Sequence, residues 1–160
     1  MTVREFYIIA RRNELPVFKR VLAALPQDKF AYKPHERSPS TEQIVWTMTQ
    51  EQDACISLVK TGELNFQPNK PPAPERMLAD FEKHYSQLLE DVTKMDESTW
   101  HTNGQFKVQG QLRMEMPIGQ FLWLFHNDAI HHRGQLAAYI RPMGGKVPSF
   151  YGPSGDDPGN

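Results

Sequence analysis

The sequence predicts an all-α protein in which four long helices pack side by side as a four-helix bundle. Three observations predict this fold class. Four segments of the 160-residue chain carry apolar residues at the three- and four-residue spacing of a buried helix face. The first two segments that connect them are rich in proline, which interrupts helices. No stretch shows a convincing pattern for a sheet.

The first helix is expected to run from Thr2 to Leu25, with Pro26 ending it. Pro16 lies inside this range and can kink the helix, because its ring removes a backbone donor. The apolar residues that share one side are Val3, Phe6, Tyr7, Ala10, Val17, Val21 and Ala24. We expect that side to face the core.

The second helix is expected to begin near residues 38–41 and to stop before Gly62. Ser40 and Gln43 have the spacing of a capping box, while Ser38 before a proline allows a slightly earlier start. A glycine at position 62 suits the left-handed residue that closes a helix. Local signals therefore mark both ends of this helix.

The third helix is expected over Pro74–Met95 and the fourth over Pro117–Pro142. Between them, the segment Trp100–Met116 has apolar residues at even spacing, and Gly110 can make a turn. These even-spaced residues are Phe106, Val108, Leu112, Met114 and Met116. We expect a short hairpin or an extended strap there, before the last helix.

Residues 1–147 are expected to form the bundle, and residues 148–160 a tail rich in proline and glycine. Phe150 and Tyr151 suggest that the first half of the tail packs on the body. From Ser154 onward the tail is expected to fray.

Composition excludes some classes of function. The formal net charge is -1, which does not favour a protein that binds nucleic acid. The single cysteine, Cys55, cannot form an internal disulfide, so a reducing cytoplasm is expected. The N-terminus lacks the apolar core of a signal peptide, and no run has the length of a membrane span.

The fourth helix places polar residues on a stripe that is otherwise apolar. At about 100° per residue, Asp128 and His132 lie one turn apart in the middle of the inward arc. The arc as a whole contains Phe121, Phe125, Asp128, His132, Leu136, Tyr139 and Met143. On the same wheel His126 and Arg133 point to the opposite side, and His131 lies on the flank.

The second helix repeats this pattern. Its inward arc holds Ile44, Thr47, Glu51, Ala54, Cys55 and Leu58. Thr47 and Glu51 lie one turn apart near its centre, and a buried carboxylate needs a cation, a hydrogen-bond partner or a proton. We therefore expect one shared polar site in which Asp128 and His132 bind a single ion and Glu51 supplies a third arm.

Structural alternatives accompany each assignment. Asp128 and His132 can form a buried ion pair, with Thr47 or Glu51 completing a hydrogen-bond network. Glu51 can also lean to solvent as an ordinary surface residue. Cys55 is expected to be a small core residue rather than a reactive thiol. No role is assigned to the three remaining histidines, which are His35, His84 and His101.

Two motifs resemble those of the DinB/YfiT-like superfamily. They are "HHRGQLAAYIRPMGG" in the last helix and "VPSFYGPSGDD" in the tail. In that family the last helix carries H-x-x-x-H-R-G-Q-L, and a third histidine comes from the second helix. The resemblance extends over most of the chain. It implies a bundle that holds a divalent metal through three histidines, often in a thiol transferase or a related hydrolase or isomerase.

The chain departs from that ligand pattern at two of three positions. His132 matches the second histidine of the last helix, but Asp128 stands where the first is expected. Aligning "SPSTEQIVWTMTQEQ" with the family's second helix places Thr47 at the third position. The site is either rebuilt from Asp128, His132, Glu51 and Thr47 for zinc, nickel, manganese or iron, or has lost its metal.

Two hypotheses follow for the function. The first is a metal-dependent enzyme, a thiol transferase or hydrolase, acting on a small thiol or electrophile. Glu51 would serve as third ligand or general base, and His131 would shuttle protons at the rim. The second is a non-catalytic binding or structural protein that forms a homodimer through Trp123, Phe150 and Tyr151. The charge balance opposes DNA binding.

Overall fold

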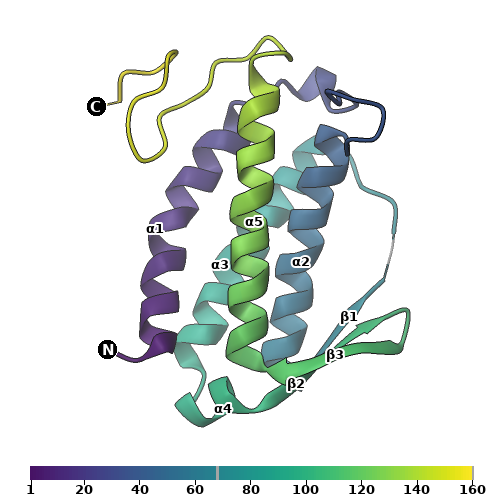
Figure 1. The fold of residues 1–160 in the computed structure, drawn as a ribbon, viewed down its shortest axis with the longest axis vertical. Helices are drawn as coiled ribbons and strands as arrows, with labels where there is room; N and C mark the ends of the chain where they lie inside the picture. Colours follow the sequence, from purple (N-terminus) through teal and green to yellow (C-terminus); the bar gives the residue numbers. More distant parts are fainter. Residues whose placement is uncertain (68, 160) are drawn as a thin grey trace.

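The computed structural model describes residues 1–67 and 69–159, and shows a mainly helical molecule with a small sheet at one end (Figure 1). Four long helices run along its length and account for most of the chain. They are α1 (Val3–Ala23), α2 (Thr41–Thr61), α3 (Pro74–Lys94) and α5 (Ile118–Ile140). The expected long helices are therefore present.

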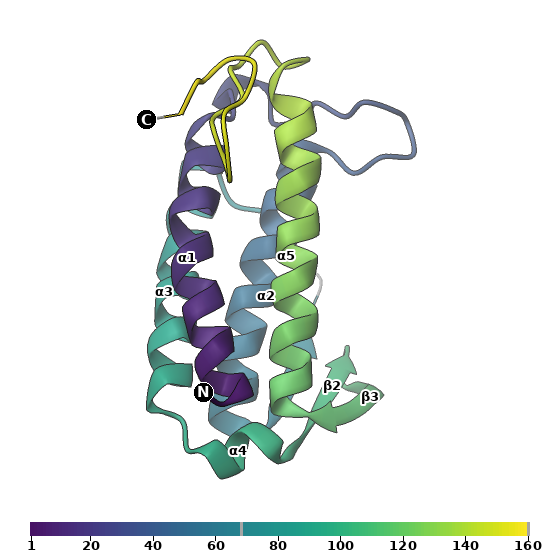
Figure 2. The same cartoon turned by 60° about the vertical axis from the view of Figure 1, so that its left-hand side comes forward.

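The long helices pack in a ring. Helix α2 contacts both α3 and α5, and α1 contacts the same two helices from the other side. The turned view in Figure 2 shows α1 beside α3 and in front of α2, with α5 completing the group. As a result, α2 and α5 lie against each other along the length on which the sequence predicts a shared site.

Local signals set the ends of α2 as expected. The Ser40 hydroxyl accepts a hydrogen bond from the Gln43 backbone N–H, and the Gln43 side chain accepts one from the Ser40 N–H. Gly62 ends the helix with φ of 77°, a left-handed conformation in which glycine has no steric penalty. These contacts confirm Ser40 as the cap.

The all-α class requires a correction, because three strands form a sheet. Strand β2 (Asn103–Val108) pairs antiparallel with β3 (Gln111–Pro117), which confirms the expected hairpin with its turn at Gly110. Strand β1 (Glu63–Phe66) pairs parallel with β2 and was not expected. It lies in a segment that its proline content marks as a linker, and only four of its residues pair.

Two short helices also lie outside the expected pattern. A single 3₁₀ turn, η1, spans Gln27–Lys29, and α4 spans Glu97–His101. Trp100 of α4 is buried and packs directly over Gly119 at the start of α5, where a Cβ atom would collide with its ring. This contact fixes the position of the N-terminal end of α5.

The core consists of two apolar clusters at successive levels of the bundle. One cluster includes Ile44 at the start of α2, and the other includes Leu58 near its end. Between these levels α2 buries three polar side chains, Thr49, Glu51 and Gln52. The middle of the bundle is therefore polar where its two ends are apolar.

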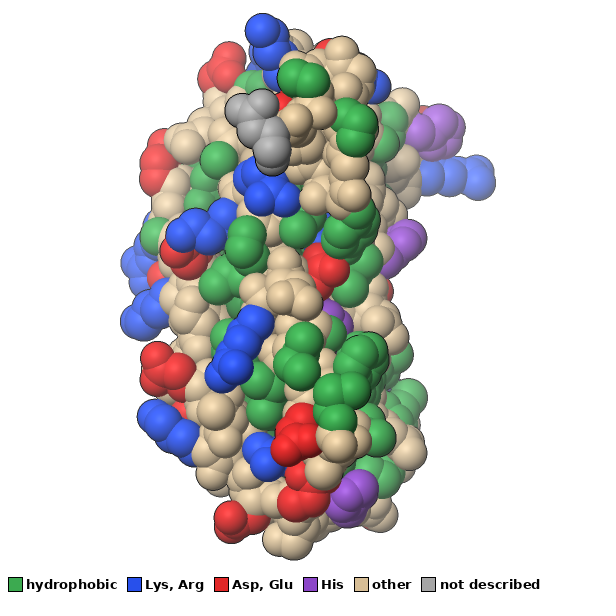
Figure 3. All heavy atoms as spheres, turned by 90° about the vertical axis from the view of Figure 1, so that its left-hand side faces the viewer, with side chains coloured by type: hydrophobic (Ala, Val, Ile, Leu, Met, Phe, Trp, Pro, Cys, Tyr) green, Lys and Arg blue, Asp and Glu red, His purple; other side chains and the backbone are tan. Residues whose placement is uncertain are grey.

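One side of α1 differs from the expected buried face. Val3 and Phe6 are exposed rather than buried, and Phe6 stacks on Trp123 of α5 with ring centroids 5.7 Å apart. Figure 3 shows this side of the molecule, where green apolar side chains are more frequent in the right-hand half and lie among charged groups. The homodimer stays a prediction, since this apolar surface alone does not establish a partner.

The tail is held in place, so the expected fraying from Ser154 is wrong. Ser154 donates to the Val147 carbonyl oxygen. The carboxylates of Asp156 and Asp157 accept hydrogen bonds from the backbone N–H groups of Val147 and Ser149, at 2.9 and 2.8 Å. These hydrogen bonds hold a segment that its proline and glycine content predicts to be disordered.

Among the residues that the structure describes, no helix is both long enough and apolar enough to cross a membrane.

Candidate metal centre

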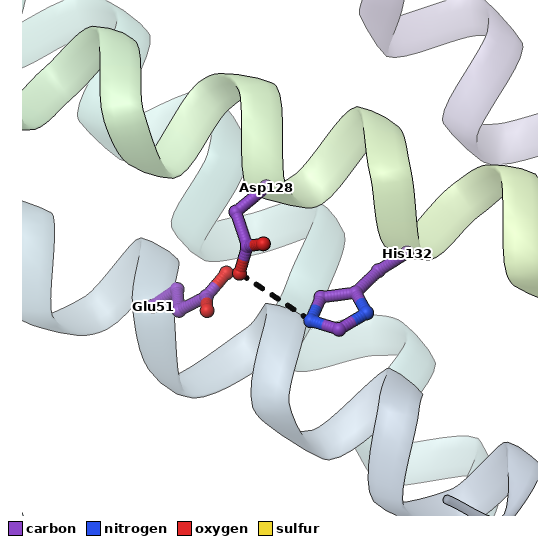
Figure 4. Close-up of side chains that lie close together, drawn as sticks. All are labelled: Glu51, Asp128 and His132. Carbon is purple, nitrogen blue, oxygen red and sulfur yellow. Dashed lines mark ion pairs between the residues drawn. The ribbon is translucent and has the colours of Figure 1, made fainter. Parts of the chain in front are cut away.

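Three side chains from two neighbouring helices converge in the polar middle of the bundle (Figure 4). Glu51 comes from α2, and Asp128 and His132 come from α5. One potential ligand atom from each residue lies within 4.8 Å of the others. Asp128 and His132 share a face because residues four apart on a helix are neighbours. The structure therefore brings these three predicted site residues together.

The cluster is open on one side and closed on the other. The side chain of Asp128 is 41% exposed and that of His132 is 18% exposed, whereas Glu51 as a residue is only 4% exposed. The expected inward placement of Asp128 needs correction, since its carboxylate lies at the edge of the α2–α5 contact. This arrangement leaves an approach to the cluster from solvent.

Glu51 is the buried member of the cluster. Burial raises the pKa of Glu51 to about 9, and both a hydrogen bond with Asp128 and the negative charge of Asp128 add to the increase. Among the described residues, no group hydrogen-bonds to its Oε2 atom. Two carboxyl groups can lie this close only when a proton or a cation reduces their repulsion.

His132 is oriented from both sides. Its Nε2 lies 3.3 Å from Oδ2 of Asp128, and its Nδ1 lies 2.8 Å from Oε1 of Gln135. In the tautomer in which Nδ1–H donates to Gln135, the lone pair of Nε2 points toward the carboxylates. Ligand histidines in metal sites usually have such a partner on the other ring nitrogen.

Thr47 occupies the remaining predicted ligand position. It lies one turn before Glu51 on α2, is half-buried, and lines a surface groove of about 700 Å³ together with Lys33 and Arg37. A neutral hydroxyl is a weak ligand for a divalent ion. Its role as a ligand stays a prediction.

His131 is exposed on α5 beside the cluster. Its ring centroid lies 5.5 Å from that of His132. The imidazole is thus at the rim of the site and in contact with solvent. The role of His131 in proton exchange, like the role of Glu51 as a general base, stays a prediction.

The helical wheel implied that His126 and Arg133 point away from the core, but both side chains are buried. His126 is 1% exposed and packs edge-on against Tyr7 and Trp123. Burial lowers the pKa of His126 to about 3, and the charges of Arg11 and Arg133 lower it further. The wheel assumed one buried face, but α1 covers a second face of α5.

Arg133 connects the tail to the bundle. Its guanidinium pairs with Glu14 of α1 and donates to the Tyr151 hydroxyl at 2.5 Å. Tyr151 in turn donates to Glu14 at 2.5 Å. This part of the quoted "HRGQ" motif therefore holds the tail rather than the candidate metal.

Sequence reasoning missed a buried arginine behind the cluster. Arg11 is 1% exposed, donates to Gln52 at 2.8 Å, and lies over the Tyr85 ring at 3.7 Å from its centroid. Continuing the stripe from Tyr7 by one turn along α1 would have found it. Cys55 is a buried core residue as expected, and burial raises the pKa of its thiol to about 12.

The fold and the cluster together define a helical-bundle protein with a candidate divalent-metal centre of two carboxylates and one imidazole. The chain belongs to the DinB family, whose sequence profile matches residues 10–158. This match confirms the resemblance seen in the last helix and the tail.

Individual relatives agree with this assignment. The chain is 26% identical over 152 residues to the uncharacterized protein YjoA of Bacillus subtilis, covering 91% of this chain and 92% of that protein. The crystal structure of YjoA superposes with a TM-score of 0.70 at 18% identity, covering 90% of this chain and 96% of YjoA. A DinB-like protein from Bacillus cereus gives the same TM-score at 19% identity, with 91% and 95% covered.

A more distant similarity links the fold to an enzyme. The mycothiol-dependent maleylpyruvate isomerase superposes with a TM-score of 0.65 at 15% identity. The match covers 85% of this chain but 61% of the isomerase. At this identity the similarity shows a shared fold.

Proposed function

We propose that Glu51, Asp128 and His132 together bind one divalent metal ion, and that the protein is a metal-dependent enzyme acting on a small molecule. The observation that carries this proposal is the convergence of three ligand atoms within 4.8 Å. The Oε2 atom of Glu51, which has no hydrogen-bond partner among residues 1–67 and 69–159, supports it. A cation would satisfy this oxygen and offset the repulsion between the two carboxylates.

The donor set fits a divalent ion. Carboxylate oxygen and imidazole nitrogen are acceptable ligands for zinc, manganese, iron and nickel. Compared with the three histidines expected from the family resemblance, this set is richer in oxygen and carries more negative charge. We expect it to favour harder ions, such as manganese or iron, more than a three-histidine set does.

Three ligands leave an open position for a substrate thiol or a water molecule. When bound, the metal would lower the pKa of that group and make it a nucleophile near neutral pH. Asp128 and His132 lie at the accessible edge of the cluster, so a substrate would reach it from solvent. His131, exposed at the rim, would pass the released proton to solvent.

The reaction class we favour is thiol transfer to an electrophile, with hydrolysis as the related alternative. Support comes from the shared fold with a mycothiol-dependent isomerase, which is an analogy of scaffold rather than of site. We therefore expect a low-molecular-weight thiol as one substrate.

The metal content of protein purified without chelator tests the proposal. We expect about one ion per chain in the parent protein and its loss in both Asp128→Ala and His132→Ala. His131→Ala and Asp53→Ala are matched controls, because both residues are exposed and lie outside the cluster. A parent protein that takes up no zinc, manganese, iron or nickel, or variants that keep the ion, would contradict the proposal.

The second candidate is a binding or structural protein without metal. The contact between Asp128 and His132 at 3.3 Å favours it. An ion pair between these two residues, with a protonated Glu51 beside Asp128, would balance the charges of the cluster without a cation. Under this alternative a chelator leaves the melting temperature unchanged. Bound metal raises it by mass action.

A further inference from the structure

We propose that a second cavity, separate from the metal centre, binds a small organic amine. The cavity has a volume of about 320 Å³ and lies between α2, α3 and the segment around β1. Small-molecule sites are typically concave, with apolar walls and a few polar groups, and begin at roughly this size. Its lining suits an ammonium group attached to an apolar or aromatic body.

Two aromatic side chains supply the apolar walls. Trp46 comes from α2 and Phe66 from β1. The indole Nε1 of Trp46 already donates to Asn69, at 2.9 Å to the side-chain oxygen, which leaves the ring face for a ligand. An aromatic face attracts a cation through its quadrupole, and Trp is the strongest of the aromatic residues in this respect.

Hydrogen bonds hold the wall of the cavity in place. Gln50 donates to the Asn69 side chain at 2.7 Å and to the Gln67 carbonyl at 3.2 Å. Together with the Trp46 bond, these contacts hold Gln67 and Asn69 against α2. A preformed wall reduces the ordering cost of binding.

The charge of the residues that line the cavity favours a positively charged ligand. Asp53 contributes a carboxylate, and no Lys or Arg is among the described residues that line the cavity. The Nδ1 atom of His84 is buried and has no hydrogen-bond partner within the described part of the chain. When unprotonated it would accept a bond from a ligand N–H, whereas an anionic ligand would meet the carboxylate of Asp53.

This cavity does not depend on the proposed metal. Trp46, Gln50, Asp53 and Ser57 follow one another at helical spacing and share one face of α2. Glu51 lies on a different face, directed toward α5. The amine site and the metal site can therefore be tested separately, in protein treated with chelator.

Proton–nitrogen NMR spectra of the whole chain test the proposal, with 2-phenylethylamine as the probe. We expect a saturable shift of the Trp46 indole N–H signal, assigned with Trp46→Phe. The probe 3-phenylpropionate has a similar ring and length but the opposite charge, and we expect at least about tenfold weaker binding of it. The comparison of the two probes needs no variant, so it tests the role of charge in the parent protein.

Asp53→Asn tests the carboxylate itself. We expect it to weaken amine binding by about tenfold or more, while Asp28→Asn, at an exposed position outside the cavity, leaves binding unchanged. No saturable shift with the amine, equal binding of both probes, or unchanged affinity in Asp53→Asn would each overturn the proposal.

Discussion

Glu51 should make the metal-free protein less stable as pH rises. Its pKa is about 9 in the folded protein and 4.5 as an ordinary carboxyl. Between these values the folded state holds a proton that the unfolded state has lost, so the free energy of unfolding falls with increasing pH. This contribution is fully present below pH 4.5 and is lost progressively up to pH 9.

The size of the effect follows from the two pKa values. Each pH unit above 4.5 lowers the free energy of unfolding by about 1.4 kcal/mol. At pH 7 this one side chain has therefore lowered it by about 3 kcal/mol. Glu51→Gln removes the titrating group and keeps the shape of the side chain. We therefore expect this variant to gain stability relative to the parent protein by about 3 kcal/mol between pH 4.5 and 7.

Urea unfolding with chelator present, followed across this pH range, measures the difference. Glu36→Gln is the matched control, because Glu36 is exposed in the loop before α2. A stability difference between parent and Glu51→Gln that does not change with pH would refute the reasoning. With metal bound, the slope should disappear, and about one proton should be released per ion at pH 7.

Three further expectations concern the surroundings of the site. His126 has a folded-state pKa of about 3, so stability should fall by about 1.4 kcal/mol per unit as pH drops below 6.5, and His126→Phe should reduce that slope in acid unfolding. Gln135→Ala should weaken metal binding by about tenfold to a hundredfold in calorimetric titration, because His132 loses its orienting contact. Arg133→Ala should destabilise the protein by about 3–5 kcal/mol in urea unfolding, because the largely buried carboxylate of Glu14 loses its ion-pair partner and keeps only the Tyr151 hydroxyl, whereas an unchanged midpoint would contradict this role.

The elements that the sequence predicts well are those set by nearby residues. Ser40 and Gln43 cap α2 through contacts three residues apart, and Gly62 ends it with its own backbone conformation. Strand β1 escaped prediction because four residues carry little pattern, and its partner β2 lies about forty residues further along the chain. Pairing over such a distance depends on the assembled bundle.

Some residues of the candidate site could likewise be predicted from nearby sequence, and others could not. Spacing alone placed Asp128 and His132 on one face, and the polar position in α2 pointed to Glu51. The wheel could not show that α1 buries a second face of α5, so the positions of His126 and Arg133 became clear only from the packing. Helix periodicity identifies which residues share a face, but it does not show how many other helices pack against that helix.

The most direct test of the metal centre is an anomalous difference map from crystals grown with manganese or zinc. We expect one strong peak within about 2.0–2.3 Å of Glu51, Asp128 and His132, lying between α2 and α5. A map without density between these helices, or with the ion held elsewhere, would contradict the central claim that these three side chains form a metal site.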